Sequence, residues 1–588
     1  MLPAGYRNQL LHLHDGLGRG TVGAHSNDPT QATLRSTEFW LQRLFPLRVV
    51  VVVTIVAIVA ALIAVFFGAS ALVAAGIAVV VLAVGLVRLH GVTLVGAIVR
   101  PVRFAWYRSR RESRDPGGQP FDVPLPEGGR YGLRWDGSKL IVTLRIEARP
   151  QTMTLLSPGS LITDEVIPLP EIARCLTQFD ITLDSIDVIS NGSRAHSNSE
   201  VARIYDQILG PLPATAQRTV WLVLRLDPLA NAAAVQRRGG GSVGALKTAI
   251  VAARRIANRL AERGLQVSVL SAAEMNDALQ QVTGGVPLDD VEETWRDNEF
   301  GEFRMTSFEV GVDLLDAQGL TKIWTMSSLA TTLTLRLRRG HVDGEIAVSA
   351  YVRFDTMGEI EGVPIDGLSP LHGKQHQALL SSLPTGGHEE QAGAREHFGP
   401  PEALAGLALP AAGCGQLIGA DQYGRGVAVP LVGSRIRRVE LIGNLHLAQQ
   451  VILRAIALGA NVLVHTNRHE AWRSMVTRVD SPEALHLATW NAASQQAGTA
   501  QSATVVVYDG VDVSGHVSDA TIMRLNPPGT DTRFLEADVT LVQARYAASQ
   551  VSVRTDMGTV ATTMVATPDE MRYIGGSLDV GERGPVRV

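Results

Sequence analysis

The sequence contains little cysteine and no excess of positive charge. Only Cys175 and Cys414 occur among 588 residues, far apart in the chain, so a disulfide framework is excluded and a reduced cytoplasmic setting is favoured. The formal net charge is −4, whereas a general nucleic-acid-binding protein carries a basic excess. We therefore expect no nucleic-acid partner.

Two common sequence signatures of catalysis are also missing. The chain has no HExxH zinc motif and no paired CxxC. We therefore predict that the protein is not an enzyme, with no catalytic residues, no cofactor, no cofactor-binding residues and no metal ligands. A membrane-anchored α/β enzyme or a nucleotide-binding regulator is the alternative, because the chain contains α/β patterns and glycine-rich loops.

One long stretch almost lacks charge. Residues 47–87 carry Arg48 alone, and Gly68 to Ser70 divide them into two apolar halves. Each half has about 18 to 19 apolar residues, enough for a helix to cross a hydrocarbon core roughly 30 Å thick. We predict a transmembrane helical hairpin over residues 47–90. A buried hairpin of a soluble protein is the alternative, whereas a cleaved signal peptide is shorter and nearer the start.

Arginines flank this stretch on both sides, while the break between its halves has no charge. By the positive-inside rule both flanks face the cytoplasm, which predicts a multi-pass protein of the inner (plasma) membrane with two spans and with N- and C-termini in the cytoplasm. Alanines at helical spacing give each helix a flat side that packs against the other helix or against a partner. The arginines are Arg35, Arg43, Arg48, Arg88, Arg100, Arg103, Arg108, Arg110, Arg111 and Arg114, and the alanines are Ala57, Ala60, Ala61, Ala64, Ala71, Ala74, Ala75 and Ala78.

Composition divides the rest of the chain into further segments. A polar cytoplasmic tail covers residues 1–46, and a basic juxtamembrane segment covers residues 91–118. Strand and helix patterns mix over residues 119–383, which predicts a mixed α/β cytoplasmic domain, and the charged stretch 384–401 is a predicted linker. Strands alternating with helices over residues 402–588 predict a second, three-layer α/β cytoplasmic domain with a parallel sheet. The predicted fold class is thus a membrane-anchored α+β protein.

Three blocks of sequence resemble one known family. They are YGLRWDGSKLIVTLRI at Tyr131–Ile146, the segment Thr219–Gly264, and WTMSSLATTLTLRLRRG at Trp324–Gly340. Together with the double apolar stretch, they make residues 35–370 similar to EccE, a membrane subunit of the actinobacterial ESX (type VII) protein secretion system. The resemblance implies a non-catalytic structural subunit of the inner-membrane core complex, which assembles with EccB, EccC and EccD and associates with the mycosin protease. The resemblance does not assign an active site to any residue of this chain.

Two segments imitate part of a nucleotide site. In Gly239–Thr248 (GGGSVGALKT), Leu246 stands where a P-loop needs a glycine before its lysine. Farther along, Val439–Asn444 enters a helix as a P-loop strand would, and Val505–Asp509 resembles a Walker B strand, but no lysine is placed to reach the phosphates. We predict a degenerate P-loop-like or Rossmann-like scaffold without nucleotide chemistry.

Acidic residues and histidines gather in several places without a metal-binding pattern. Asp289–Glu299 is predicted to be a solvated helix face, with Trp295 inside it. The other candidate ligands lie in loops or in the tail, where solvation is the expected state. These candidates are His12, His14, His372, His376, His388, His397, Asp509, Asp512 and Asp519.

Overall fold

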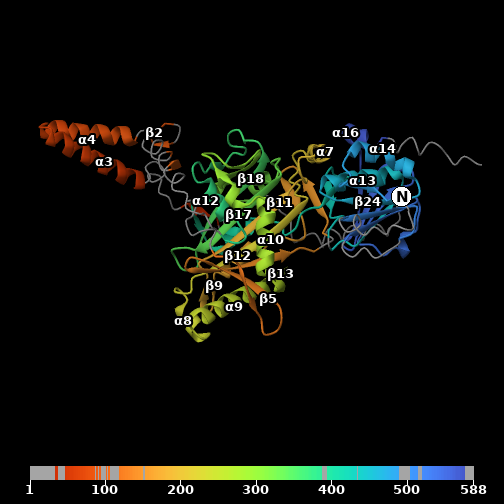
Figure 1. The fold of residues 1–588 in the computed structure, drawn as a ribbon, viewed down its shortest axis with the longest axis horizontal. Coiled ribbons are helices and arrows are strands. Elements are labelled where there is room, and N and C mark those ends of the chain that lie inside the picture. The colour runs from red at the N-terminus through yellow and green to blue at the C-terminus, as the bar shows by residue number, and fades with distance from the viewer. Residues whose placement is uncertain are drawn as a thin grey trace, which may run out of the picture.

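Two large β-sheets organise the computed structural model, which is a mixed, sheet-rich α+β fold (Figure 1). The structure describes residues 33–36, 47–86, 88–89, 92–93, 101, 104–105, 118–149, 152–386, 394–433, 435–488, 503–513 and 520–575. Most of the predicted tail, with His12 and His14, and most of the predicted basic segment 91–118 therefore lie outside the described residues.

The first sheet has 14 strands, and all of its pairs are antiparallel. Its main path runs β14-β15-β16-β18-β17-β11-β12-β6-β5-β4. The turn at Gly137, where φ is 57°, joins β5 to β6, while Gly344 with φ 83° lies between β17 and β18. The strands are β1 Arg35–Ser36, β4 Phe121–Pro124, β5 Arg130–Asp136, β6 Lys139–Glu147, β11 Ser185–Ser193, β12 Gln217–Leu226, β13 Gln266–Val269, β14 Glu292–Glu293, β15 Asn298–Phe300, β16 Phe303–Val310, β17 Ala330–Arg339, β18 Ile346–Met357, β19 Leu368–Pro370 and β20 His397–Gly399.

Helices cover the faces of this sheet. Helix α9, Gly241–Glu262, buries Ala249, Ala253, Ile256 and Leu260 in one core cluster with strand residues such as Leu222. This is the amphipathic helix that the 3.6-residue spacing predicts. The other helices around the first sheet are α6 Leu169–Arg174, α8 Ala232–Arg237, α10 Ala272–Thr283, α11 Ala317–Ile323 and α12 Gln375–Ser381, with 3-10 turns η1 Leu288–Asp290, η2 Val312–Leu314 and η3 Pro401–Gly406.

A fully buried ion cluster lies inside the first sheet. Asp187 of β11 is 0% exposed and accepts hydrogen bonds from Arg225 of β12 and Arg336 of β17. Burial alone would raise the pKa of Asp187, but the two guanidinium charges outweigh it and lower that pKa to about 2. The carboxylate therefore stays ionised and ties three adjacent strands together.

The second sheet has 12 strands, six of them in a parallel block. The order is β25-β24-β26-β27-β23-β28-β29-β30-β21-β22-β7-β8, and every pair from β25 to β28 is parallel. The parallel sheet is as predicted from the alternation of strands and helices. The strands are β7 Thr154–Ser157, β8 Ser160–Ile162, β21 Gln416–Ala420, β22 Gly426–Val429, β23 Arg438–Ile442, β24 Val462–Thr466, β25 Leu485–Leu487, β26 Val505–Asp509, β27 Thr521–Asn526, β28 Val539–Ala544, β29 Ala547–Thr555 and β30 Gly558–Thr563.

The described helices of this region lie on one face of the parallel block. Alternate strand residues such as Leu441 and Val507 join one core cluster with α7, α13, α14 and α16, whereas Val506 and Tyr508 face a separate small cluster. The described helices therefore cover one face of the parallel block, and the three-layer arrangement stays a prediction. These helices are α7 Glu200–Leu209, α13 Leu445–Ala457, α14 His469–Val479 and α16 Pro568–Ile574, with η4 Thr532–Phe534.

Each sheet contains elements from outside the sequence range that supplies most of its strands. Strands β7 and β8 and helix α7, all from the range 119–383, join the second sheet and its core. In return, β20 from the range 384–401 pairs with β18, and the carbonyls of Thr385 and Gly386 accept hydrogen bonds from buried Arg134. The division into 119–383, 384–401 and 402–588 stays a prediction, while the sheets themselves interlock.

The apolar stretch forms a helical hairpin, but the predicted membrane crossing is contradicted. Helices α3, Leu47–Phe66, and α4, Ala71–Leu86, pack side by side, with Ala57 and Ala74 buried between them (Figure 1). Within the described residues, no helix has both the length and the apolar character that a bilayer span requires. Helix α4 has 16 residues. At 1.5 Å per residue it reaches about 24 Å, short of a core roughly 30 Å thick.

Three predictions change with this finding. The two-helix transmembrane hairpin, the membrane-anchored fold class and the localisation as a two-span plasma-membrane protein with cytoplasmic termini are all wrong. The apolar run misled because residues 67–70 add hydrophobicity without adding helix length. Flanking Arg35, predicted to mark the cytoplasmic side of a span, instead pairs with Phe398 in the first sheet. Two short strands, β2 Arg88–Leu89 and β3 Val92–Thr93, follow the hairpin.

Candidate functional site

The carboxyl ends of the parallel strands are the first place to look for a ligand site, because open α/β sheets bind ligands there. The structure brings the two predicted nucleotide-like segments to this edge: Gly443 and Asn444 follow β23, and Asp509 ends β26. Strand β27 separates them, since it pairs with both β23 and β26. Two strand spacings put the segments about 10 Å apart.

Asp509, the Walker B-like carboxylate, is fully engaged by its own neighbours. It is 1% exposed and accepts hydrogen bonds from the Thr466 hydroxyl at 2.9 Å and the Trp472 indole N–H at 2.8 Å. Arg468 adds an ion pair through two guanidinium nitrogens. These donors occupy the carboxylate oxygens that a metal or a nucleophilic water would need. Asp512 is exposed, and Asp519 lies outside the described residues.

The start of α13 is likewise filled by side chains. Asn444 caps the helix by accepting a hydrogen bond from the Leu447 amide at 2.9 Å, and Gln543 accepts one from the Asn444 amide at 2.9 Å. A Cβ at Gly443 would lie 2.7 Å from Gln543 Oε1, so this glycine allows a side chain, not a phosphate, to approach closely. The backbone amides that would cradle a phosphate are thus used inside the fold.

The glycine-rich segment Gly239–Thr248 does not follow a strand directly. Strand β12 ends at Leu226, and helix α8 lies between it and the glycines. Helix α9 then begins at Gly241, where Gly240 at φ 69° allows the tight entry, and Gly244 packs against the Val235 carbonyl. The segment joins two packed helices, and Lys247 is exposed on the outer face of α9.

The acidic segment Asp289–Glu299 is not the predicted solvated helix face. It contains strand β14 and part of β15, and Glu293, Asp297 and Asn298 are buried. Trp295 stacks on His372 with ring centroids 5.9 Å apart. Asp289, Asp290 and Glu292 remain exposed, whereas Glu293 accepts a hydrogen bond from the His376 amide and Asp297 pairs with Arg304 of β16.

The predicted metal candidates do not come together in the part of the chain that the structure describes. No group of three or more His, Cys, Asp or Glu side chains in those ranges has metal-binding geometry. His376 and His397 are buried on different elements, α12 and β20, and His388 lies outside the described residues. Burial raises the pKa of both Cys175 and Cys414 to about 11, so both thiols are protonated at neutral pH.

An exposed aromatic side chain marks a different surface, which we call the arginine tip. It comprises Phe179, Leu229, Arg237, Arg238 and Arg255, and it lies where β9 and α8 meet α9, far from the second sheet (Figure 1). Strands β9 Thr177–Gln178 and β10 Ile181–Thr182 form a small hairpin whose turn carries Phe179. Phe179 is 97% exposed and Leu229 is 80% exposed.

The backbone of Phe179 is strained, and Asp180 holds it in place. Phe179 has φ 52°, a left-handed conformation that a bulky residue rarely adopts. Asp180 forms ion pairs with Arg237 at 3.0 Å, Arg238 at 2.8 Å and Arg255 at 3.4 Å. The hydrogen bond from Arg238, reinforced by the other two arginines, holds the pKa of Asp180 well below its ordinary value. One carboxylate against three guanidinium groups leaves the arginine tip positively charged.

A groove of about 520 Å³ runs beside Phe179 between β9 and α9. Arg255, Arg259 and Arg263 line it at successive turns of α9. Glu171 of α6 pairs with Arg259 and Arg263, and the hydrogen bond from Arg259 is the main reason that the pKa of Glu171 is lowered. The groove and the arginine tip thus form one continuous surface with an exposed aromatic ring and a surplus of cations.

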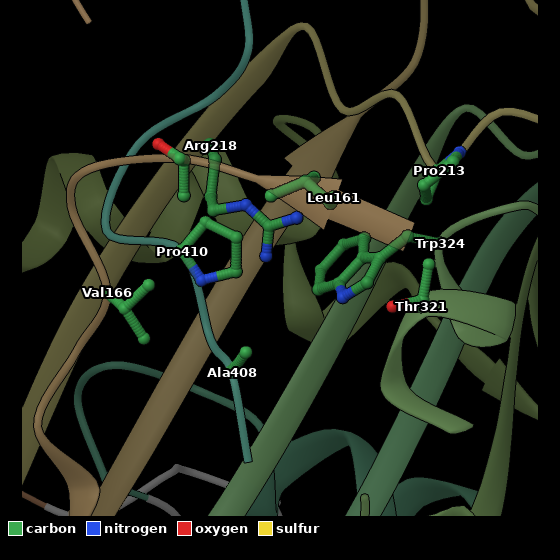
Figure 2. Close-up of a pocket in the computed structure, with 9 residues that line it drawn as sticks. Leu161, Val166, Pro213, Arg218, Thr321, Trp324, Ala408 and Pro410 are labelled. Atoms are coloured by element: carbon green, nitrogen blue, oxygen red, sulfur yellow. The ribbon is translucent and has the colours of Figure 1, made fainter. Parts of the chain in front are cut away.

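A small, partly open cavity lies at the seam between the two sheets, in the region that Figure 2 shows. Its volume is about 20 Å³, and its lining combines Arg218 of β12, Trp324 beside α11, and Pro410 of the connection into the second sheet. The Arg218 guanidinium lies 3.9 Å from the Trp324 ring centroid. Sequence analysis missed both this cavity and the arginine tip, because neither Arg218 nor Phe179 belongs to a recognisable motif.

Comparison with known proteins gives consistent results. A family model described as "Putative type VII ESX secretion system translocon, EccE" matches residues 214–310. The chain is similar to ESX-1 secretion system protein EccE1 of Mycolicibacterium smegmatis, with 27% identity over 61% of this chain and 70% of that protein. It is 32% identical to EccE1 of Mycobacterium tuberculosis over 28% of this chain, which spans 36% of that relative's length. ESX-5 secretion system protein EccE5 of Mycobacterium marinum is 27% identical over 53% of this chain and 78% of its own length.

Proposed function

Because this chain belongs to the EccE family, we propose that it is a non-catalytic structural subunit of an ESX type VII secretion system and that it works by binding other subunits. Its partners in this proposal are EccB, EccC and EccD and the mycosin protease of the same system, as the family resemblance implies. The proposal extends the names of the relatives, which assign them to ESX-1, ESX-2 and ESX-5 secretion systems, to this chain.

The observation that carries the proposal is the arginine tip with its adjoining groove. An aromatic ring that is 97% exposed has no role in the core, and its left-handed backbone costs about 1–2 kcal/mol relative to an ordinary conformation. Aromatic and arginine side chains are the residue types that dominate protein–protein binding energy. We assign this surface to a partner segment that is acidic and that covers Phe179.

The carboxyl edge of the parallel strands supports a non-catalytic role. Asp509 and the amide of Asn444, where a metal and a phosphate would bind in a nucleotide-using relative, are hydrogen-bonded within the fold. A nucleotide would have to displace Arg468, Trp472 and Gln543 before reaching them. No observation favours the alternative of an enzyme or a nucleotide-binding regulator.

Purification of the tagged full-length chain from its own cells under native conditions tests the proposal. We expect a large multi-subunit assembly that contains other components of the secretion system, and no saturable binding of ATP or GTP at millimolar concentration. Recovery of the chain alone under gentle conditions would contradict the structural role. Saturable nucleotide binding would instead favour a regulator.

A further inference from the structure

The seam cavity contains an arginine whose charge is not balanced by a carboxylate. Arg218 donates to two neutral hydroxyls, Ser190 Oγ at 2.9 Å and Thr215 Oγ1 at 3.0 Å. Within the described residues, no carboxylate oxygen lies within ion-pair distance of its guanidinium. Arg225 and Arg454, which are buried, are paired with Asp187 and Glu570, whereas the half-buried Arg218 has no such pair among the described residues. Arg218 is therefore a different case.

The described residues around Arg218 carry no other negative charge. Burial lowers the pKa of Arg218 to about 9, which still leaves the group protonated at neutral pH. The acidic side chain whose field acts on it is the Cys414 thiol, and burial raises the pKa of that thiol to about 11. The two hydroxyl groups that accept hydrogen bonds from Arg218, those of Ser190 and Thr215, are also neutral. The cation is thus held near the seam without a counter-charge from the described residues.

Two hydrogen-bond donors at this cavity are unsatisfied. Arg218 Nε and Trp324 Nε1 are both buried, and neither has a hydrogen-bond acceptor among the described residues. Trp324 itself is 5% exposed. An unsatisfied buried donor costs about 1–3 kcal/mol. Because two such donors lie beside the same cavity, an acceptor bound in the cavity would remove both costs. Figure 2 shows the guanidinium lying between Pro410 and the Trp324 ring, at the cavity itself.

We propose that this cavity binds a halide-sized monovalent anion, such as chloride, between Arg218 and Trp324. An anion accepts from both donors and neutralises the guanidinium, whereas a water molecule leaves the charge unbalanced and needs acceptors for its own protons. The volume of about 20 Å³ admits a single water-sized particle and excludes phosphate or a nucleotide.

The position of the cavity gives the anion a structural role. The lining residues come from β12 in the first sheet and from the connection around Pro410. In that connection, Ala411 N–H donates to the carbonyl of Glu165, which follows β8 of the second sheet, and Cys414 N–H donates to the carbonyl of Thr215, which precedes β12. An anion here would stabilise the junction of the two sheets. The inference concerns the fold's internal coupling and is independent of the proposed secretion role.

Thermal unfolding of the purified full-length chain in halide and in gluconate tests the proposal. At constant ionic strength, we expect the Tm to rise saturably as chloride or bromide replaces gluconate. Arg218→Gln should abolish this dependence, while Arg203→Gln, which removes a charge from an exposed position on α7, should retain it. If Arg218→Gln does not fold, Trp324→Phe keeps a ring but loses the N–H, and the half-saturating halide concentration should rise at least about tenfold.

Crystals soaked in sodium bromide give the direct readout. We expect an anomalous bromine peak between the guanidinium of Arg218 and the indole nitrogen of Trp324. A Tm that is equal in halide and gluconate, together with no bromine peak, would overturn the proposal and leave a structural water or an empty cavity. A halide dependence that persists unchanged in both Arg218→Gln and Trp324→Phe would also overturn it, because the anion would then bind elsewhere.

Discussion

The carboxyl edge of the parallel strands and the arginine tip differ in how far their charged groups are balanced by neighbouring residues. At the carboxyl edge, Asp509 is buried and holds three partners from its own domain. At the arginine tip, one carboxylate faces three arginines and Phe179 stands in solvent. A polar group that is satisfied internally stabilises the fold and has no capacity left for a ligand. A surface with surplus charge and an exposed ring retains that capacity, so we propose the arginine tip, and not the carboxyl edge, as the binding surface.

The largest effect should come from breaking the carboxyl edge. Asp509→Ala leaves the buried Trp472 N–H and the buried Thr466 hydroxyl without their acceptor, and each unsatisfied buried polar group costs about 1–3 kcal/mol. Urea denaturation should show this loss in the free energy of unfolding. The matched control is Asp512→Ala, three residues away and exposed, which should change stability by no more than about 0.5 kcal/mol. Equal, small effects of the two substitutions would mean that Asp509 is free for another role.

Acid should weaken the buried cluster of the first sheet, and only at low pH. The folded pKa of Asp187 is lowered to about 2, so its contribution is complete above its unfolded pKa near 4 and is lost as pH falls through about 2. The contribution amounts to about 2 kcal/mol. The difference in unfolding free energy between the parent and Asp187→Asn should be constant from pH 8 to about 5 and shrink below about 4. A difference that already shrinks between pH 7 and 5 would contradict the cluster as described.

A small gain in stability should follow from removing the backbone strain at Phe179 of the arginine tip. Phe179→Gly removes the left-handed strain of about 1–2 kcal/mol and loses an exposed cation–π contact with Arg255 worth about 0.5–1 kcal/mol. We expect the free energy of unfolding to rise by about 0.5 kcal/mol. Tyr546→Gly is the control, because Tyr546 is 96% exposed but has no positive φ. If Phe179→Gly destabilises the chain as much as Tyr546→Gly does, the strain is not real.

The elements with a strong local pattern were predictable from the sequence. The spacing of Leu246, Ile250 and Leu260 predicts α9, and the turn signal at Gly137 predicts the β5–β6 hairpin. The parallel strands β23, β24 and β26 follow from short apolar runs between helices. Two features escaped because they depend on distant neighbours: β7 and β8 join the second sheet, and Asp289–Glu299 contains strand β14 and part of β15.

The candidate sites were harder to predict for the same reason. The sequence around Asp509 resembles a Walker B strand, and only the fold shows that Trp472 and Arg468 occupy its carboxylate. Phe179 and Arg218 are ordinary residues in the sequence. What distinguishes them is exposure in one case and a missing counter-charge in the other, and both are properties of the assembled structure.

Retention of partner subunits by a single tip variant tests the central claim most directly. Full-length tagged chains carrying Phe179→Asp or Tyr546→Asp would be purified natively beside the parent, and the co-purifying subunits quantified by mass spectrometry. Losing a central aromatic contact of a binding surface costs 2 kcal/mol or more, which corresponds to about a thirtyfold weaker affinity. We predict that Phe179→Asp loses most of its partners while Tyr546→Asp keeps them. Equal retention by the two variants would contradict the assignment of the arginine tip as the docking surface.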